Sequence, residues 1–75
     1  KKMKGKVKWF DAQLGYGFIQ SEEVENDIYV HFSEIMMSGF KTLDEGDLVK
    51  FDYDPELKKA VNVYKIEQEE VETVA

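Results

Sequence analysis

Seventy-five residues make one small domain with a limited core, and the absence of cysteine excludes disulfide bonds and thiolate metal sites. No apolar run is long enough for a membrane span or a signal peptide, so we expect a soluble protein of the cytoplasm. The net charge of -6, taken alone, argues against a nucleic-acid partner.

The charges are unevenly distributed along the chain. Residues 1–20 hold five lysines and one acidic residue, whereas residues 21–75 hold five lysines and fifteen acidic residues. The basic part coincides with the first aromatic residues, so the net charge does not exclude a nucleic-acid partner at that part. All ten basic residues are lysine, which excludes bidentate arginine contacts to phosphate or guanine.

The first predicted strand, residues 4–10, places its three lysines on one face. Strict alternation puts Trp9 on the opposite face, buried beside Val7. A bend at Gly5 or a bulge after Lys8 would instead turn Trp9 to the lysine side. The residues by themselves leave both positions of Trp9 open. A turn over residues 11–15 follows, in which we expect Leu14 to be exposed.

Two further strands, residues 15–20 and 27–32, form a predicted hairpin across a polar, acidic connection. With a period of two, one face of the hairpin carries Tyr16, Phe18, Tyr29 and His31. The other face carries Ile19, Ile28, Val30 and Phe32. The second face suits a hydrophobic core, and the first face must be covered or must bind a partner. Gly17 leaves both neighbouring rings unobstructed, and glycine in a strand marks a bend or a close approach.

A fourteen-residue connection, residues 33–46, follows the hairpin. We expect a single helical turn at residues 33–35, with Ser33 as its cap. A loop of this length is often functional, and its aromatic residue Phe40 is either a core anchor or a binding residue.

Two last strands are predicted at residues 48–53 and 60–66. In the first of them Val49, Phe51 and Tyr53 share one side, and in the second Val61 and Val63 are expected to point inward. Residues 67–75 carry four glutamates and are expected to form a disordered acidic tail. Five short strands without a long helix predict an all-β domain closed into a small barrel.

Four strings closely resemble the bacterial cold-shock proteins: Gly5-Lys6-Val7-Lys8-Trp9-Phe10, Gly15-Tyr16-Gly17-Phe18-Ile19, Ile28-Tyr29-Val30-His31-Phe32 and Gly39-Phe40-Lys41-Thr42-Leu43. The second and third strings are similar to the two ribonucleoprotein motifs of that family. The resemblance covers residues 3–66, so we expect a cold-shock domain there and the tail at 67–75. It implies a five-stranded antiparallel OB-fold barrel, which agrees with the strand count.

The resemblance also implies a surface that binds single-stranded RNA and DNA, and it favours the exposed position of Trp9. The implied binding residues are Lys8, Trp9, Tyr16, Phe18, Asp27, Tyr29, His31, Phe32 and Phe40. Among them, Asp27 would bond a base edge. The implied roles are those of an RNA chaperone and a regulator of transcription and translation in the cold-shock response. Leu14 stands where the family usually has lysine, which removes one phosphate contact.

Other functions have less support in the residues. His31 is the only histidine, so we expect no metal site, no cofactor and no enzyme active site. The alternative function is a small β-barrel that binds a protein through its aromatic face. We expect a monomer, with strand exchange into a dimer through the long loop as the alternative. A minor hypothesis is that the acidic tail competes with nucleic acid for the lysines.

Overall fold

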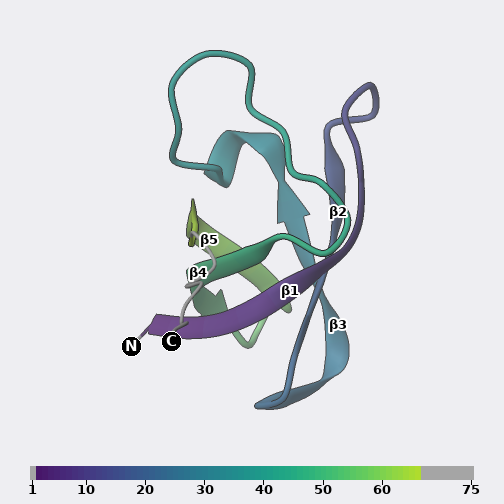
Figure 1. Cartoon of the computed structure of the whole chain (residues 1–75). Coiled ribbons are helices and arrows are strands. Elements are labelled where there is room, and N and C mark those ends of the chain that lie inside the picture. Colours follow the sequence, from purple (N-terminus) through teal and green to yellow (C-terminus); the bar gives the residue numbers. More distant parts are fainter. Residues whose placement is uncertain (1, 67–75) are drawn as a thin grey trace, which may run out of the picture.

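The computed structural model describes residues 2–66, which form five strands and one turn of 3-10 helix. The elements are β1 (Lys2–Asp11), β2 (Tyr16–Ser21), β3 (Val24–His31), η1 (Phe32–Glu34), β4 (Leu48–Asp54) and β5 (Lys59–Lys65). The strands close into a barrel in the order β1-β2-β3-β5-β4 (Figure 1). This closure confirms the predicted all-β barrel. The acidic tail predicted at residues 67–75 lies outside the described residues.

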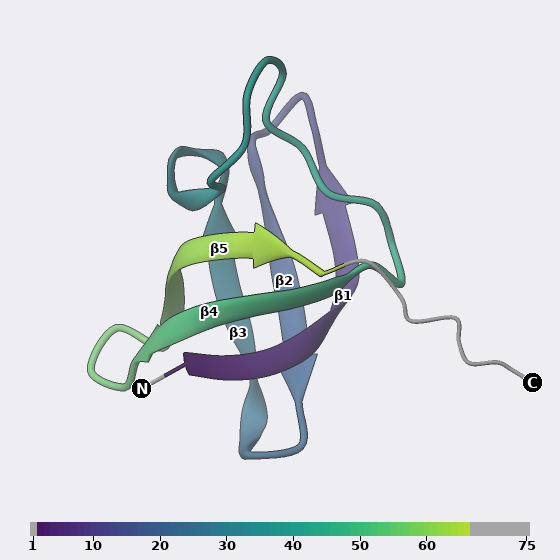
Figure 2. The same ribbon diagram turned by 60° about the vertical axis from the view of Figure 1, so that its left-hand side comes forward.

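Strand β1 pairs with two different strands along its length. Its first half pairs with β4, with Lys2 opposite Asp52, and its second half pairs with β2, as far as Asp11 opposite Tyr16. Figure 2 shows β1, β4 and β5 side by side, with β2 and β3 crossing behind them. These pairings are antiparallel, and a short parallel contact between β3 and β5 closes the barrel. The outside of the barrel therefore has a β1–β2–β3 face and a β1–β4–β5 face, which meet along β1.

The core fills the barrel with aliphatic side chains and one large aromatic ring. The buried hydrophobic residues are Val7, Ile19, Ile28, Val30, Ile35, Leu43, Val49, Phe51, Ala60 and Val63. The predicted inner face of the hairpin is confirmed for Ile19, Ile28 and Val30, each with none of its surface exposed. Burying each such side chain contributes about 1.5–3 kcal/mol.

The predicted inward position of Val61 is wrong. Val61 is only partly buried, and the buried residues of β5 are Ala60 and Val63. Between them, Asn62 adopts a positive φ of 52°, and the register against β4 shifts at the same place. The extra residue in β5 breaks the period of two, because a bulge rotates the side chains that follow it.

Two boundaries around the hairpin also differ from the prediction. Strand β3 begins at Val24, so the acidic connection is reduced to the two residues Glu22 and Glu23. Strand β3 ends at His31, and the helical turn begins at Phe32 with His31 as its cap, not at Ser33. Phe32 therefore leaves the alternation of β3, and its predicted position on the inner face is wrong.

Candidate nucleic-acid interface

A β-bulge at Lys8 brings Trp9 to the outside of the barrel. Val7 pairs with Ile19 and Trp9 pairs with Phe18, so β1 has one residue more than β2 between these pairs. Lys8 is that extra residue, and Trp9 is 38% exposed after it. The bulge was one of the two alternatives that the sequence left open for Trp9, and the structure confirms the exposed position.

Gly17 lies where β1 and β2 approach each other behind this bulge. A Cβ atom at Gly17 would lie 2.6 Å from the Cα atom of Phe10 and in contact with the carbonyl oxygen of Trp9. Only glycine fits at this distance, because a real Cβ atom does not come that close to another backbone. Glycine is therefore required at position 17 by the backbone of β1, which approaches on the side where a Cβ atom would point. The rings of Tyr16 and Phe18 lie on the opposite side of β2.

Four aromatic rings form one connected cluster on the β1–β2–β3 face. The ring centroid of Trp9 lies 5.8 Å from that of Tyr16 and 5.5 Å from that of Phe18. The ring of Tyr29 lies 5.8 Å from that of Tyr16 and 5.9 Å from that of Phe18. Edge-to-face and tilted contacts of this kind stabilise the rings against one another while leaving part of each ring surface exposed. We call Trp9, Tyr16, Phe18, Tyr29 and His31 the aromatic platform.

His31 is held in place by the turn that follows β3. Its Nδ1 atom accepts a hydrogen bond from the backbone N–H of Ser33 at 3.2 Å and lies 2.8 Å from the hydroxyl oxygen of Ser33. The accepted hydrogen bond places the proton of the neutral ring on Nε2. The imidazole lies 4.6 Å from the ring of Phe32, so the platform continues to Phe32 past the end of β3.

Phe32 and Phe40 line a pocket beside the platform, at the end of the barrel where the long loop meets the β1–β2 turn. The pocket has a volume of about 410 Å³, and its walls include Leu14, Phe32, Phe40 and Lys41. Phe40 is 72% exposed, which decides between the two predicted positions in favour of the surface. Gly15 has a φ of 83° and lies against the ring of Phe32. A Cβ atom at this position would lie 2.7 Å from the Cδ2 atom of Phe32. We call this the loop pocket.

Two of the predicted binding residues pair with each other. The ammonium group of Lys8 donates a hydrogen bond of 2.9 Å to a carboxylate oxygen of Asp27. Since Lys8 lies on β1 and Asp27 on β3, this ion pair crosses over β2 at the edge of the platform. Both side chains are exposed, so the pair is weak and can open toward a phosphate or a base.

The structure therefore places the nine predicted residues in three groups: the platform, the loop pocket and the Lys8–Asp27 ion pair. Leu14 is not among the predicted binding residues. Its predicted exposure is confirmed, since it is 61% exposed in the wall of the loop pocket. The signal was the position of Leu14 in the family pattern, because a residue that replaces a binding lysine remains in reach of the ligand.

Residues 2–66 contain neither a candidate metal site nor a candidate membrane-spanning helix. That part of the chain has no group of three or more histidine, aspartate or glutamate side chains that could hold a metal ion. It also has no helix long and apolar enough to cross a membrane.

Curated bacterial proteins are similar to most of the chain. The Cold shock-like protein of Thermotoga maritima is 58% identical over 50 residues, which cover 67% of this chain and 74% of that protein. The Cold shock-like protein CspE of Escherichia coli is 53% identical over 51 residues, with coverages of 68% and 74%. The Cold shock-like protein CspC of Buchnera aphidicola is 46% identical over 67 residues, which cover 87% of this chain and 97% of that protein.

The fold has a solved counterpart in the structure of "drosophila Unr CSD456", with a TM-score of 0.78 and 22% sequence identity. The match covers 96% of this chain and 29% of that one, and it confirms the cold-shock type of OB-fold barrel. The family model described as 'Cold-shock' DNA-binding domain matches residues 3–66. Proteins of this family bind nucleic acid and are not enzymes, and the chain belongs to the family.

Proposed function

We propose that the protein binds single-stranded RNA and DNA by stacking bases on the aromatic platform and in the loop pocket. The observation that carries this proposal is the connected, partly exposed cluster of Trp9, Tyr16, Phe18 and Tyr29 on one face of the barrel. Each stacked base contributes about 1–3 kcal/mol, and any base offers a π-face, so the sequence preference is weak. Duplex bases already stack on one another, which favours single strands as the target.

Reversible binding of this kind makes the protein an RNA chaperone. A strand held on the platform is withdrawn from hairpins by mass action, and this requires no ATP. The same competition would change the signals that RNA hairpins give to transcription and translation in the cold-shock response. We expect the protein to do this as a cytoplasmic monomer.

The test is a titration followed by the fluorescence of Trp9, which lies within the platform. A single-stranded oligothymidine is expected to change the fluorescence, and a duplex of equal length is expected to change it much less. Phe18→Ala should weaken binding about 5- to 150-fold, the equivalent of about 1–3 kcal/mol. Leu57→Ala is the matched control, because Leu57 is 65% exposed in the β4–β5 turn and lies outside the platform.

A protein partner is the second candidate, and the loop pocket favours it. The apolar surface of Leu14, Phe32 and Phe40 is open, and Leu14 brings no positive charge to it. An apolar peptide that displaces a fluorescent oligonucleotide would support this function. If neither the single-stranded oligothymidine nor the duplex changes the fluorescence of Trp9 at low salt, the proposal of nucleic-acid binding is contradicted.

A further inference from the structure

The outer side of β1 carries a row of lysines that leads away from the platform. Lys2, Lys4 and Lys6 alternate with inward-facing residues, and Lys8 stands at the bulge next to Trp9. Gly5 faces inward between two of them, where a Cβ atom would lie 2.6 Å from a methyl carbon of Ile19. The row from Lys4 to Lys8 spans about 13 Å at the rise of a strand, so it reaches from the platform onto the β1–β4–β5 face.

Among residues 2–66, the two lysines in the middle of this row, Lys4 and Lys6, form no ion pair with a carboxylate. Lys8 pairs with Asp27, and Lys2 pairs with Asp52 at 3.3 Å. The hydrogen bond from Lys2 holds the pKa of the Asp52 carboxyl below its usual value. Within residues 2–66, by contrast, no carboxylate lies within ion-pair distance of the ammonium groups at positions 4, 6 and 50.

Lys50 lies directly opposite Lys4 across the β1–β4 pairing. Like charges at directly opposite positions of a sheet are destabilising, and this chain has sixteen acidic residues to set against ten lysines. Three exposed lysines therefore lie close together without an ion-paired carboxylate among residues 2–66. An anion bound between them would remove the repulsion of Lys4 and Lys50.

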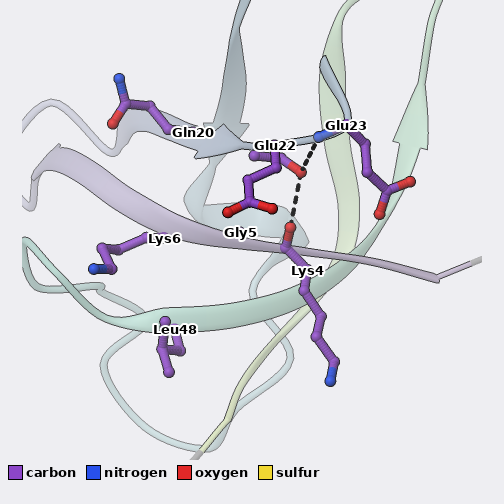
Figure 3. Close-up of a pocket in the computed structure, with 8 residues that line it drawn as sticks. Lys4, Gly5, Lys6, Gln20, Glu22, Glu23 and Leu48 are labelled. Carbon is purple, nitrogen blue, oxygen red and sulfur yellow. Dashed lines mark hydrogen bonds between the residues drawn. The ribbon is translucent and has the colours of Figure 1, made fainter. Parts of the chain in front are cut away.

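The surface beside Lys4 and Lys6 is hollowed between β1 and the β2–β3 turn. The hollow has a volume of about 330 Å³ and is shown in Figure 3. The hydroxyl of Ser21 donates to the carbonyl oxygen of Lys4 at 2.9 Å and fixes the turn against β1. Glu22 and Glu23 also line this hollow, so carboxylates bound the basic surface on the side of the β2–β3 turn (Figure 3).

We propose that Lys4, Lys6 and Lys50 hold the phosphodiester backbone of the same single strand whose bases occupy the platform. We call these three residues the basic extension. The proposal rests on the proposed function, and it adds a second contact region that recognises phosphate and not bases. The strand passes from Trp9 along β1, past Lys8, onto the β1–β4–β5 face.

The test compares an oligothymidine of about six nucleotides with the same strand carrying about six additional abasic nucleotides at either end, since an OB fold covers about 4–16 nucleotides. The abasic extension offers phosphates without bases and adds no new stacking registers. One of the two extended strands is expected to bind more tightly than the short one. Three added phosphate contacts make its salt slope steeper by about 2, so the advantage falls about 16-fold between about 50 and 200 mM salt.

The readout is the ratio of the two affinities, and Lys50→Gln is the variant that tests it. This substitution should reduce the ratio severalfold and leave the affinity for the short strand unchanged. Lys58→Gln removes the same charge in the β4–β5 turn, where the backbone of Lys58 bonds Tyr29, and should keep the wild-type ratio. A ratio of one at low salt, or a ratio that Lys50→Gln leaves unchanged, would overturn the basic extension.

The same titrations separate this inference from the proposed function. If the short strand binds and neither extension helps, the platform stands and the basic extension is wrong. If the short strand fails to bind, the platform is wrong. If removal of residues 67–75 creates an advantage for the extended strand that the full chain lacks, the lysines are occupied by the acidic tail, and the proposal is wrong for the intact protein.

Discussion

The two outer faces of the barrel share one strand and differ in almost everything else. On the β1–β2–β3 face, Trp9 and its neighbours present rings that contact one another. On the β1–β4–β5 face, Lys4 and Lys50 present like charges in direct register. Contacts between rings stabilise the first face even without a ligand, whereas repulsion between like charges destabilises the second.

The difference arises at a single residue of β1. Before Lys8 the outward side chains are lysines, and after it the outward side chain is Trp9, because the bulge shifts the alternation by one position. One strand can therefore contribute both to a stacking surface and to a charged surface. The close approach of Gly17 to β1 is the condition for this arrangement.

The largest effect, on the free energy of unfolding, is expected from Gly17→Ala, because Gly17 packs against β1 where the two faces meet. The new methyl group would overlap the backbone of β1 at Phe10 and Trp9, and no flexible side chain can move to relieve it. We expect a loss of about 3 kcal/mol or more in the free energy of unfolding, at or above the range for overpacking. Urea denaturation measures this loss.

Gly39→Ala is the control for that experiment. Gly39 has a φ of 76° but no atom within 4 Å of an added Cβ, so the substitution tests backbone strain without a clash. It should cost about 1 kcal/mol. Equal losses in the two variants would show that steric overlap at the junction is unimportant.

The second effect concerns the loop pocket. Phe40→Ala should weaken binding of oligothymidine about 5-fold or more, the lower end of the effect of removing one stacking ring. Because Phe40 is 72% exposed, the free energy of unfolding should change by no more than about 0.5 kcal/mol. Fluorescence titration and urea denaturation of the same variant separate the two quantities. A large loss of stability would indicate that Phe40 is a core anchor instead.

The sequence was sufficient for the barrel and for the inner face of the hairpin, because Ile19, Ile28 and Val30 keep a strict period of two. It was insufficient where the backbone departs from that period. Trp9 remained undecided and Val61 was misplaced for the same reason, since each lies next to a bulge that only the register of the partner strand reveals. Alternation alone also misplaced Phe32, because it does not show that β3 ends at His31.

The third effect is a gain. Leu14→Lys would place an ammonium group at the rim of the loop pocket, where Leu14 is now 61% exposed. One added phosphate contact should make the salt slope for a single strand steeper by about 0.7 and tighten binding severalfold at low salt. Affinities measured at several salt concentrations give the slope. Leu14→Gln, which adds polarity without charge, should leave the slope unchanged; a slope that rises in both variants would rule out a phosphate contact.

The smallest effect tests the repulsion on the β1–β4–β5 face. Lys50→Glu replaces the like pair with an attraction to Lys4 across the β1–β4 pairing and should raise the free energy of unfolding by about 0.2–1 kcal/mol. The gain should disappear at about 1 M salt, where exposed charges are screened within about 3 Å. Lys58→Glu changes the net charge equally in the β4–β5 turn, away from Lys4, and should bring no gain. If Lys50→Glu stabilises the fold while the advantage of the extended strand is lost, then the lysines of this face are kept at the expense of stability, as a surface that binds phosphate requires.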